Sequence, residues 1–363
     1  MEARPALRLR VIDFGYASAI QSHALYHGLA AAFAAGDASV LSLVSPIEPH
    51  ISIGLHQDLA HEIDEAYCAG RGLPVIRRRL GGGAAYLDRD QLFFHFILPG
   101  AGALEPPAAL FARTMAPVIE TYRTFGIEAR YQPPGDIVVG QRKIGACAGA
   151  AIGDASVVIG SFMFDFDAAT MASALRAPSE EFRAILRAAL EERITTMRAL
   201  LPAVPGRDEV KRRFLGECAR AFGLPVEISQ PSVPEARAIQ AAAEALLEPD
   251  STEAARGPMA RHAVKVAEGT VLSECGFKTQ GDPVRLVLLE QDGRIAELRL
   301  GGAIAGLTGR AMQALTLRLR GTALDAEALR RGLAREAADL RLALPPPELE
   351  QLARAIEAAR RQQ

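Results

Sequence analysis

The pattern of apolar and polar residues along the chain predicts a protein of the mixed α/β class. Residues 7–13 form an apolar run typical of a strand, and residues 22–35 follow with the composition of a helix that Ser18 or Ser22 can cap. Residues 91–98 are apolar on both faces, which indicates a strand near the centre of a sheet. Other runs predict strands over 39–43, 51–55, 74–79 and 157–164, and helices over 61–70, 110–125 and most of 179–223.

Two pairs of short β segments predict hairpins. Residues 136–139 and 142–147 flank Gly140 and Gln141, which suits a tight two-residue turn. Residues 283–300 contain two alternating strands joined at Asp292-Gly293, the clearest hairpin of the chain.

A shift in composition between residues 229 and 258 predicts a domain boundary. Several prolines bracket a single alanine-rich helix there, and we place the boundary near residue 250. Residues 1–250 are the expected larger domain, and residues 258–363 the expected small α+β domain. The C-terminal hairpin is followed by helices predicted to start near Gly309, Asp325 and Pro347.

Composition limits the classes of protein that fit this chain. Its 363 residues suffice for two domains, and 49% hydrophobic and 23% charged residues are globular averages. A formal charge of −2 gives no general attraction to nucleic acid or acidic membranes. The four cysteines are far apart in sequence, which favours neither a disulfide framework nor a zinc site. With no signal peptide or long apolar stretch in this sequence, we expect a cytoplasmic protein that binds neither nucleic acid nor membrane.

A run of three arginines and three glycines is the first candidate for chemistry. The strand over 74–79 ends in Arg77, Arg78 and Arg79, and Gly81 to Gly83 follow after Leu80. Glycines expose backbone N–H groups that suit phosphate or carboxylate oxygens. The run is neither a P-loop nor a dinucleotide-binding fingerprint, because Gly-Lys-Ser/Thr and the G-x-G-x-x-G spacing are missing. Taken alone, it is equally well a glycine-rich turn beside solvated arginines.

Three segments in order resemble the lipoate-protein ligase family. The run RRRLGGGAAYLD is similar to its Arg-Arg-x-Ser/Thr-Gly-Gly-Gly-Ala-Val-x-His-Asp motif, and PHISIGLHQDLAHEID matches an upstream landmark at Gly54 and Gln57. Downstream, GDIVVGQRKIGACAG places Lys143 on the active-site lysine of the family. The resemblance continues into the C-terminal part. It implies a mixed sheet backed by helices, of the biotinyl/lipoyl-transferase type, followed by a small accessory domain.

The resemblance implies an activity and a role for each matched residue. A ligase of this kind activates lipoate or octanoate with ATP and transfers the acyl group to a lysine of a lipoyl-carrier protein, either a lipoyl domain or an acceptor like the glycine-cleavage H protein. Lys143 would bridge the carboxylate and the α-phosphate, and Asp136 would carry Mg²⁺. The residues expected to bind the acyl-adenylate are Gly54, Arg78, Arg79, Gly81, Gly82, Gly83, Ala84, Gly160 and Ser161.

The chain departs from the family pattern at three places. Leu80 stands where the family usually has Ser or Thr, and Leu87 where it usually has His. Val158 lies in a segment where the family often has a pair of histidines. None of these side chains forms hydrogen bonds, so we expect a more apolar pocket than in the usual ligase.

Two other functions fit the same residues. Cys147 lies four residues after Lys143, and some proteins of this fold are octanoyl or lipoyl transferases that use a cysteine and no ATP. The lost polar groups also fit a non-catalytic relative that binds lipoyl domains, although Lys143 and the three glycines are kept. Biotin ligases share the fold, but their glycine loop is a poorer match.

Overall fold

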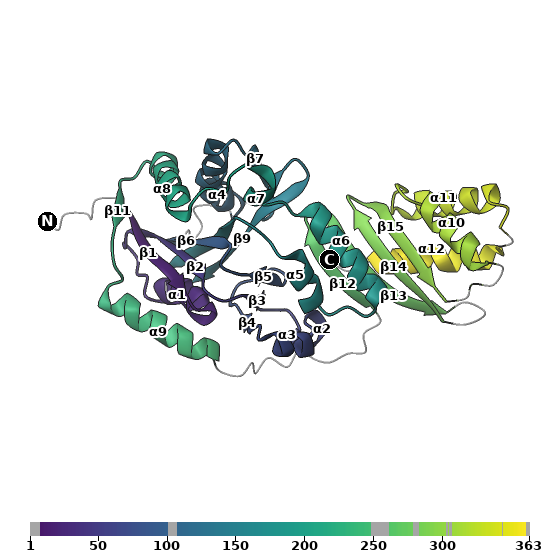
Figure 1. Cartoon of the computed structure of the whole chain (residues 1–363), viewed down its shortest axis with the longest axis horizontal. Coiled ribbons are helices and arrows are strands. Elements are labelled where there is room, and N and C mark those ends of the chain that lie inside the picture. Colours follow the sequence, from purple (N-terminus) through teal and green to yellow (C-terminus); the bar gives the residue numbers. More distant parts are fainter. Residues whose placement is uncertain are drawn as a thin grey trace. The chain divides into compact units, whose positions relative to one another are not determined.

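The computed structural model describes residues 8–100, 107–247, 261–278, 283–302, 304, 307–342 and 344–360, and its elements are labelled in Figure 1. These residues form two compact units. The first contains the chain up to residue 176 together with residues 191–254, and the second contains residues 177–190 and the chain from 255 onward. The predicted limits of 1–250 and 258–363 lie in a stretch, 248–260, outside the described residues. The units differ from that division because residues 177–190 join the C-terminal part.

The first unit is built on an eight-stranded mixed sheet. In spatial order its strands are β11 (Val226–Ile228), β1 (Leu9–Ala17), β2 (Ser39–Pro46), β6 (Gln91–Pro99), β10 (Ala155–Met163), β9 (Arg142–Ile152), β8 (Asp136–Val139) and β7 (Ala129–Gln132). Strand β1 runs parallel to β11 and β2, and the other neighbours are antiparallel. Strand β6 is buried over almost its whole length between β2 and β10. The predicted mixed sheet and its central strand are therefore confirmed.

Helices pack on both faces of this sheet because its strands alternate between two cores. Phe94 and Phe96 of β6 face a core shared with α4 (Pro107–Thr124) and α8 (Arg207–Phe222), whereas Ile97 faces α1 (Ala19–Ala31). Helix α9 (Val233–Leu247) packs on α1. Of the two predicted caps Ser18 is confirmed, so the helix starts before the predicted residue 22. It begins at Ala19, because the Ser18 side chain accepts a hydrogen bond from the Gln21 amide and forms a capping box.

A small three-stranded sheet carries the arginine and glycine run. Its order is β4 (Val75–Arg77), β3 (His50–Ile53) and β5 (Ala85–Leu87). The single helix predicted over 61–70 is wrong, because Asp58 and Asp64 cap two separate helices, α2 (Leu59–Glu62) and α3 (Glu65–Arg71). The first unit also contains the short helices α5 (Ala168–Ala174) and α7 (Met197–Leu200).

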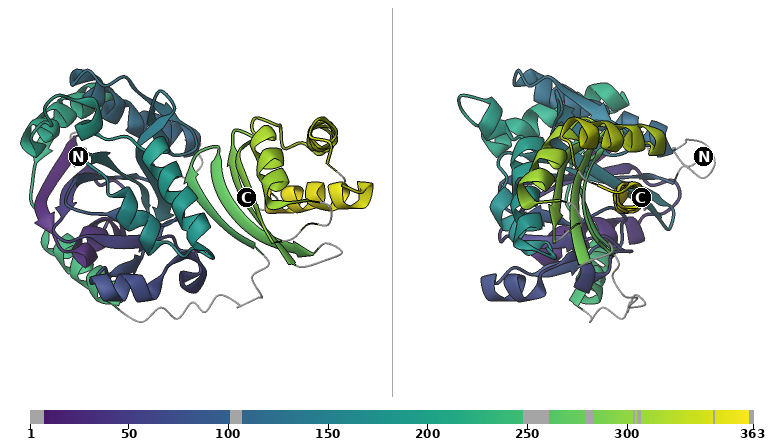
Figure 2. Two further views of the ribbon diagram at one scale, coloured as in Figure 1. Left: turned by 45° about the vertical axis from the view of Figure 1, so that its right-hand side comes forward. Right: turned by 90° about the vertical axis from the view of Figure 1, so that its right-hand side faces the viewer.

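The second unit is an antiparallel sheet between helices. Its strands are β12 (Arg261–Ala267), β13 (Thr270–Lys278), β14 (Pro283–Gln291) and β15 (Arg294–Gly301). Figure 2 shows α10 (Gly309–Arg318), α11 (Ala326–Asp339) and α12 (Pro346–Arg360) gathered on one face. Helix α6 (Glu180–Arg193) contacts the sheet through the Phe182 and His262 rings, whose centroids lie 5.2 Å apart. The predicted hairpin at Asp292-Gly293 is confirmed, with φ angles of 49° and 75°.

No helix in the described part of the chain is long and apolar enough to cross a membrane.

Candidate active site

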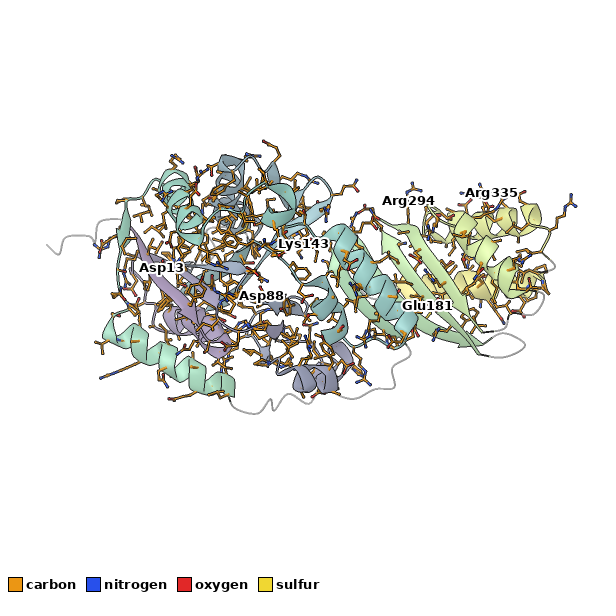
Figure 3. The ribbon with its side chains drawn as sticks, in the orientation of Figure 1. Asp13, Asp88, Lys143, Glu181, Arg294 and Arg335 are labelled. Carbon is orange, nitrogen blue, oxygen red and sulfur yellow. The ribbon has the colours of Figure 1, made fainter. Side chains whose placement is uncertain are left out.

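The hairpin of β8 and β9 holds Lys143 and Asp136 together. The Lys143 Nζ atom lies 2.8 Å from Asp136 Oδ1, and the two side chains are 22% and 9% exposed. Figure 3 labels Lys143 within the first unit. Gly140, with a φ of 60°, makes the turn that the sequence predicts. The ammonium is therefore paired with a carboxylate on the neighbouring strand.

The backbone next to Lys143 is irregular. Ile137 of β8 faces Gly145, but Val138, the next residue, faces Lys143, so Ile144 is an extra residue on β9. Such a β-bulge changes the direction of side chains and is common beside active sites. The carbonyl of Lys143 also accepts a hydrogen bond of 2.8 Å from the amide of Thr195. The main chain that carries the lysine is thus held from two sides.

Cys147 lies on the same strand in an environment that keeps it protonated. Its amide donates to the Gly135 carbonyl at 2.7 Å, and it faces Gly160 across the β9–β10 ladder. Burial, followed by the negative charge of Asp136, raises the pKa of the thiol to about 12, and Lys143 opposes this only in part. The thiolate, which is the nucleophilic form, is therefore scarce near neutral pH.

Arg78 organises the glycine loop between β4 and β5. Its Nε donates to Gly81 O at 3.2 Å, and its Nη2 donates to Gly81 O at 2.9 Å and Gly83 O at 2.7 Å. Its Nη1 donates to the carbonyl and the hydroxyl of Ser52 at 3.1 and 3.2 Å. These bonds account for the five N–H groups of a guanidinium. Among the described residues Arg78 forms no ion pair, so its positive charge is left uncompensated, and burial lowers its pKa.

The loop geometry follows from these bonds. In a trans peptide the C=O and the next N–H point in opposite directions. Because the carbonyls of Gly81 and Gly83 point toward Arg78, the amides of Gly82 and Ala84 point away from it. Gly82 has a φ of 96°, and a Cβ on Gly54 would lie 2.0 Å from the Gly82 carbonyl oxygen. The two glycines therefore permit this close approach, and two backbone donors remain directed outward.

We expect Arg78→Lys to disrupt the loop. A lysine has three donors where the guanidinium has five, and each buried acceptor left without a partner costs about 1–3 kcal/mol. The free energy of unfolding should fall by roughly 3 kcal/mol in urea titrations followed by tyrosine fluorescence. Arg130→Lys is the control, because Arg130 makes a single exposed hydrogen bond to Gly140 O. An unchanged urea midpoint for Arg78→Lys would contradict this role.

The other two arginines have different surroundings. Arg77 donates to the carbonyls of Gly54, Leu55 and Gln57 at 3.0, 3.3 and 2.6 Å, and so fixes the turn after β3. Arg79 is exposed, and only its backbone amide is held, by His27 Nε2 at 3.4 Å. Of the three arginines, Arg79 therefore has the guanidinium most accessible to a ligand.

The three departures from the family pattern lie in or against the core. Leu80 is 1% exposed and packs with Ile12 and Tyr26, and Val158 is fully buried between strands. Leu87 is half-buried against the cluster that contains Phe93. On β10, Ser161 is half-buried, and Gly160 is required because a Cβ there would lie 2.5 Å from a Phe94 ring atom.

A buried histidine cluster lies beneath the glycine loop and is absent from the sequence predictions. His23, His27, His50 and His95 are each at most 6% exposed, and Tyr26 lies among them. His95 Nδ1 forms a buried hydrogen bond of 2.7 Å with Ser42 Oγ. His23, Tyr26 and His27 have the spacing of residues on one face of a helix, and this pattern could have indicated the cluster.

The hydrogen bonds of this cluster fix its protonation. His50 Nδ1 donates to the Glu48 carbonyl at 3.3 Å, so His50 Nε2 accepts from His23 Nε2 at 3.2 Å. The Tyr26 hydroxyl then donates to His23 Nδ1 at 3.4 Å. Burial is the largest cause that lowers the pKa of each ring, to about 4 in His27 and His50 and to about 3 in His95. All four rings are neutral in the folded protein.

The site has one carboxylate suited to a metal ion that arrives with its substrate. Among the described residues no group of three or more His, Cys, Asp or Glu side chains could hold a metal ion. Mg²⁺ in nucleotide sites typically binds one or two carboxylates together with phosphates and water. Asp136 is largely buried and faces the lysine, and its carboxylate could serve as such a ligand.

Solved structures define the class of protein to which this fold belongs. The bi-partite lipoate protein ligase from Thermoplasma acidophilum, described with its E2 lipoyl domain, aligns with a TM-score of 0.61 at 20% identity and covers 66% of this chain and 92% of its own. Lipoate-protein ligase A bound with ATP aligns with a TM-score of 0.57 at 20% identity, over 66% of this chain and 95% of its own. The fold is that of the lipoate ligases.

The chain belongs to the family of the lipoyl protein ligase A/B catalytic domain, whose model matches residues 18–219. Lipoate-protein ligase LplJ of Bacillus subtilis is 34% identical over 134 residues, which are 37% of this chain and 40% of that relative. Octanoyltransferase LipM of Kyrpidia tusciae is 24% identical over 244 residues, 60% of this chain and 88% of the relative. The chain thus matches less than half the length of the Bacillus ligase, and its relatives include both enzyme types.

Proposed function

We propose that this protein is an ATP-dependent lipoate-protein ligase of the cytoplasm. The carboxylate of lipoate or octanoate attacks the α-phosphate of ATP, which gives the acyl-adenylate and releases pyrophosphate. A lysine amine of a lipoyl-carrier protein then takes the acyl group as an amide and releases AMP. The observation that carries the proposal is the Lys143–Asp136 pair, 2.8 Å apart and largely shielded from water. Support comes from the ligase relative, from the ATP-bound neighbour and from the neighbour described with a lipoyl domain.

Each residue has a task that follows from its surroundings. A carboxylate and a triphosphate repel one another, and the Lys143 ammonium reduces this repulsion where charge builds up on the α-phosphate. The outward amides of Gly82 and Ala84 bind anionic oxygens, and the uncompensated charge of buried Arg78 strengthens that binding. Arg79 pairs with phosphate from the surface. Asp136 would hold Mg²⁺, which supplies further positive charge to the phosphates.

The ATP route is favoured over the cysteine route by the state of Cys147. A thiol with a pKa raised to about 12 is a poor nucleophile near neutral pH, and a ligase needs no nucleophile of its own. The octanoyltransferase relative keeps the cysteine route as a testable alternative. A binding protein without activity would have no use for an ammonium held at the centre of the site.

The test is to incubate the full chain with ATP, Mg²⁺ and lipoate and to measure lipoyl-AMP. We expect lipoyl-AMP from the wild type and from Cys147→Ser within about threefold, because the thiol takes no part in adenylation. Octanoyl transfer without ATP that Cys147→Ser abolishes, through an acyl adduct on the cysteine, would identify the transferase instead. Lipoate binding without either product would identify the non-catalytic relative.

A further inference from the structure

A tyrosine of α4 reaches into the sheet beside the candidate active-site lysine. Tyr122 is completely buried, and its ring packs on Phe162 with centroids 5.2 Å apart. Its hydroxyl donates to the Ile144 carbonyl at 3.1 Å and accepts from the Met163 amide at 3.1 Å. One side chain therefore satisfies a backbone acceptor of β9 and a backbone donor of β10.

The register of the two strands shows what the hydroxyl replaces. The β9–β10 ladder ends at the pair Cys147 and Gly160. Three residues further along each strand, the same register would bring Ile144 opposite Met163. The hydroxyl of Tyr122 stands between these two residues, where a direct backbone bond would otherwise continue the ladder. It acts as a wedge that keeps the strands apart at this point.

The Tyr122 hydroxyl bonds to the same residue that forms the β-bulge of β9. Ile144 is the extra residue of β9 opposite β8, and the residue before it is Lys143. A bulged residue is left out of the ladder, so a buried carbonyl there needs another donor. Tyr122 supplies that donor. The side chain thus stabilises both irregularities that set the direction of Lys143, the bulge toward β8 and the opening toward β10.

We propose that Tyr122 is a positioning residue that acts on the reaction through Lys143. This inference rests on the proposed function, because it needs Lys143 in the adenylation step. Without the hydroxyl, the Ile144 carbonyl and the Met163 amide are free to bond to one another directly. That closure moves the main chain of β9 and displaces the ammonium from the reacting groups. A displacement of about 1 Å can lower a rate by about a hundredfold.

The variant that tests this is Tyr122→Phe, which keeps the ring and removes only the hydroxyl. We expect the single-turnover rate of lipoyl-AMP formation to fall at least about tenfold, with the Kd for ATP changed by less than about threefold. Thr121→Val is the matched control. It removes a buried hydroxyl from the neighbouring residue of α4, and within the described residues that hydroxyl bonds only to the Pro117 carbonyl of the same helix. That control should keep its rate within about twofold.

A double-mutant cycle separates positioning from a general loss of structure. In a Lys143→Ala background, Tyr122→Phe should cause no further loss, since its effect passes through the lysine. An equal fold-loss in both backgrounds, or a normal rate for Tyr122→Phe, would overturn the inference while leaving the ligase proposal intact. A wild type that makes no lipoyl-AMP, or Lys143→Ala with full activity, would instead remove the proposed function itself.

A measurement on the wild type keeps the inference testable if Tyr122→Phe does not fold. The chain has only seven methionines, so ¹⁵N-methionine labelling gives a short amide spectrum. The Met163 amide should exchange with solvent far more slowly than an unfolded amide, because it donates to a buried hydroxyl. In Tyr122→Phe, where it folds, this amide should stay protected, because it then bonds directly to the Ile144 carbonyl. Free exchange in the wild type would show that the bridge is absent.

Discussion

Lys143→Ala should lower the rate of acyl-adenylate formation by about a thousandfold. Removing one preorganised charge or donor from a developing transition state costs about 10²–10³ in rate, and this ammonium is the only lysine of the β8–β9 hairpin. Asp136 would also be left buried without its ion-pair partner at 2.8 Å. The measurement is single-turnover formation of lipoyl-AMP, with folding checked by thermal unfolding.

Lys211→Ala is a closely matched control for that variant. Lys211 also pairs with an aspartate of the first unit, Asp13, at 2.8 Å, and its side chain is 14% exposed. Both variants lose an ion pair of the same length made by a largely buried lysine, although Asp13 is 38% exposed and Asp136 only 9%, and only one variant loses the ammonium of the candidate site. Equal rates for the two variants would show that Lys143 has no special part in the reaction.

The first unit is expected to lose stability steeply as the pH falls below about 6.5. The four buried histidines are neutral when folded, with pKa values lowered to about 4 in His27 and His50, whereas an unfolded histidine titrates near 6.5. A lowered folded pKa means that the unfolded chain binds more protons, so the stability is complete above the unfolded pKa and is lost below it. Between pH 7 and 5.5 His27, His50 and His95 each cost roughly 1.2 kcal/mol, or about 4 kcal/mol for the three, and His23 adds to the loss in the same direction.

Tyrosine fluorescence can report this loss for the first unit alone. The chain has no tryptophan, and all six tyrosines lie between residues 16 and 131. Urea unfolding at several pH values should show that the wild type takes up protons on unfolding at pH 5.5, and that His50→Gln takes up about one fewer. His56→Gln should match the wild type, because His56 is exposed. A free energy that stays flat from pH 7 to 5.5 would contradict the neutral cluster.

The features that the sequence predicts well are local. The β8–β9 hairpin depends on two alternating segments around Gly140, and its prediction placed Lys143 on a strand beside Asp136. The glycine loop was likewise visible from residues that follow one another. A turn and its flanking strands are determined mainly by neighbouring residues, which one sequence contains in full.

The features that escaped prediction depend on residues far apart in the chain. Arg78 donates to the carbonyl of Ser52, which lies 26 residues earlier in the chain. This contact anchors the guanidinium whose other donors hold the glycine loop. The histidine cluster combines α1, β3 and β6, and the wedge combines α4 with β9 and β10. No single-sequence pattern reveals which distant backbone groups a side chain reaches, because tertiary packing decides it. We therefore propose that Arg78, expected from the resemblance to bind the acyl-adenylate, acts by supporting the outward amides of the loop.

Because of helix α6, the gene cannot be cut between its N-terminal and C-terminal parts without dividing the second unit. The region that the family model matches, residues 18–219, contains residues 177–190, yet these belong to the unit completed only by residues after 254. Phe182, Leu186 and Leu190 of this helix are buried. A gene ended after residue 247 would encode the helix without the strands that cover it, and would expose an apolar face prone to aggregation. In recombination or domain exchange, the helix and the C-terminal sheet have to be inherited together.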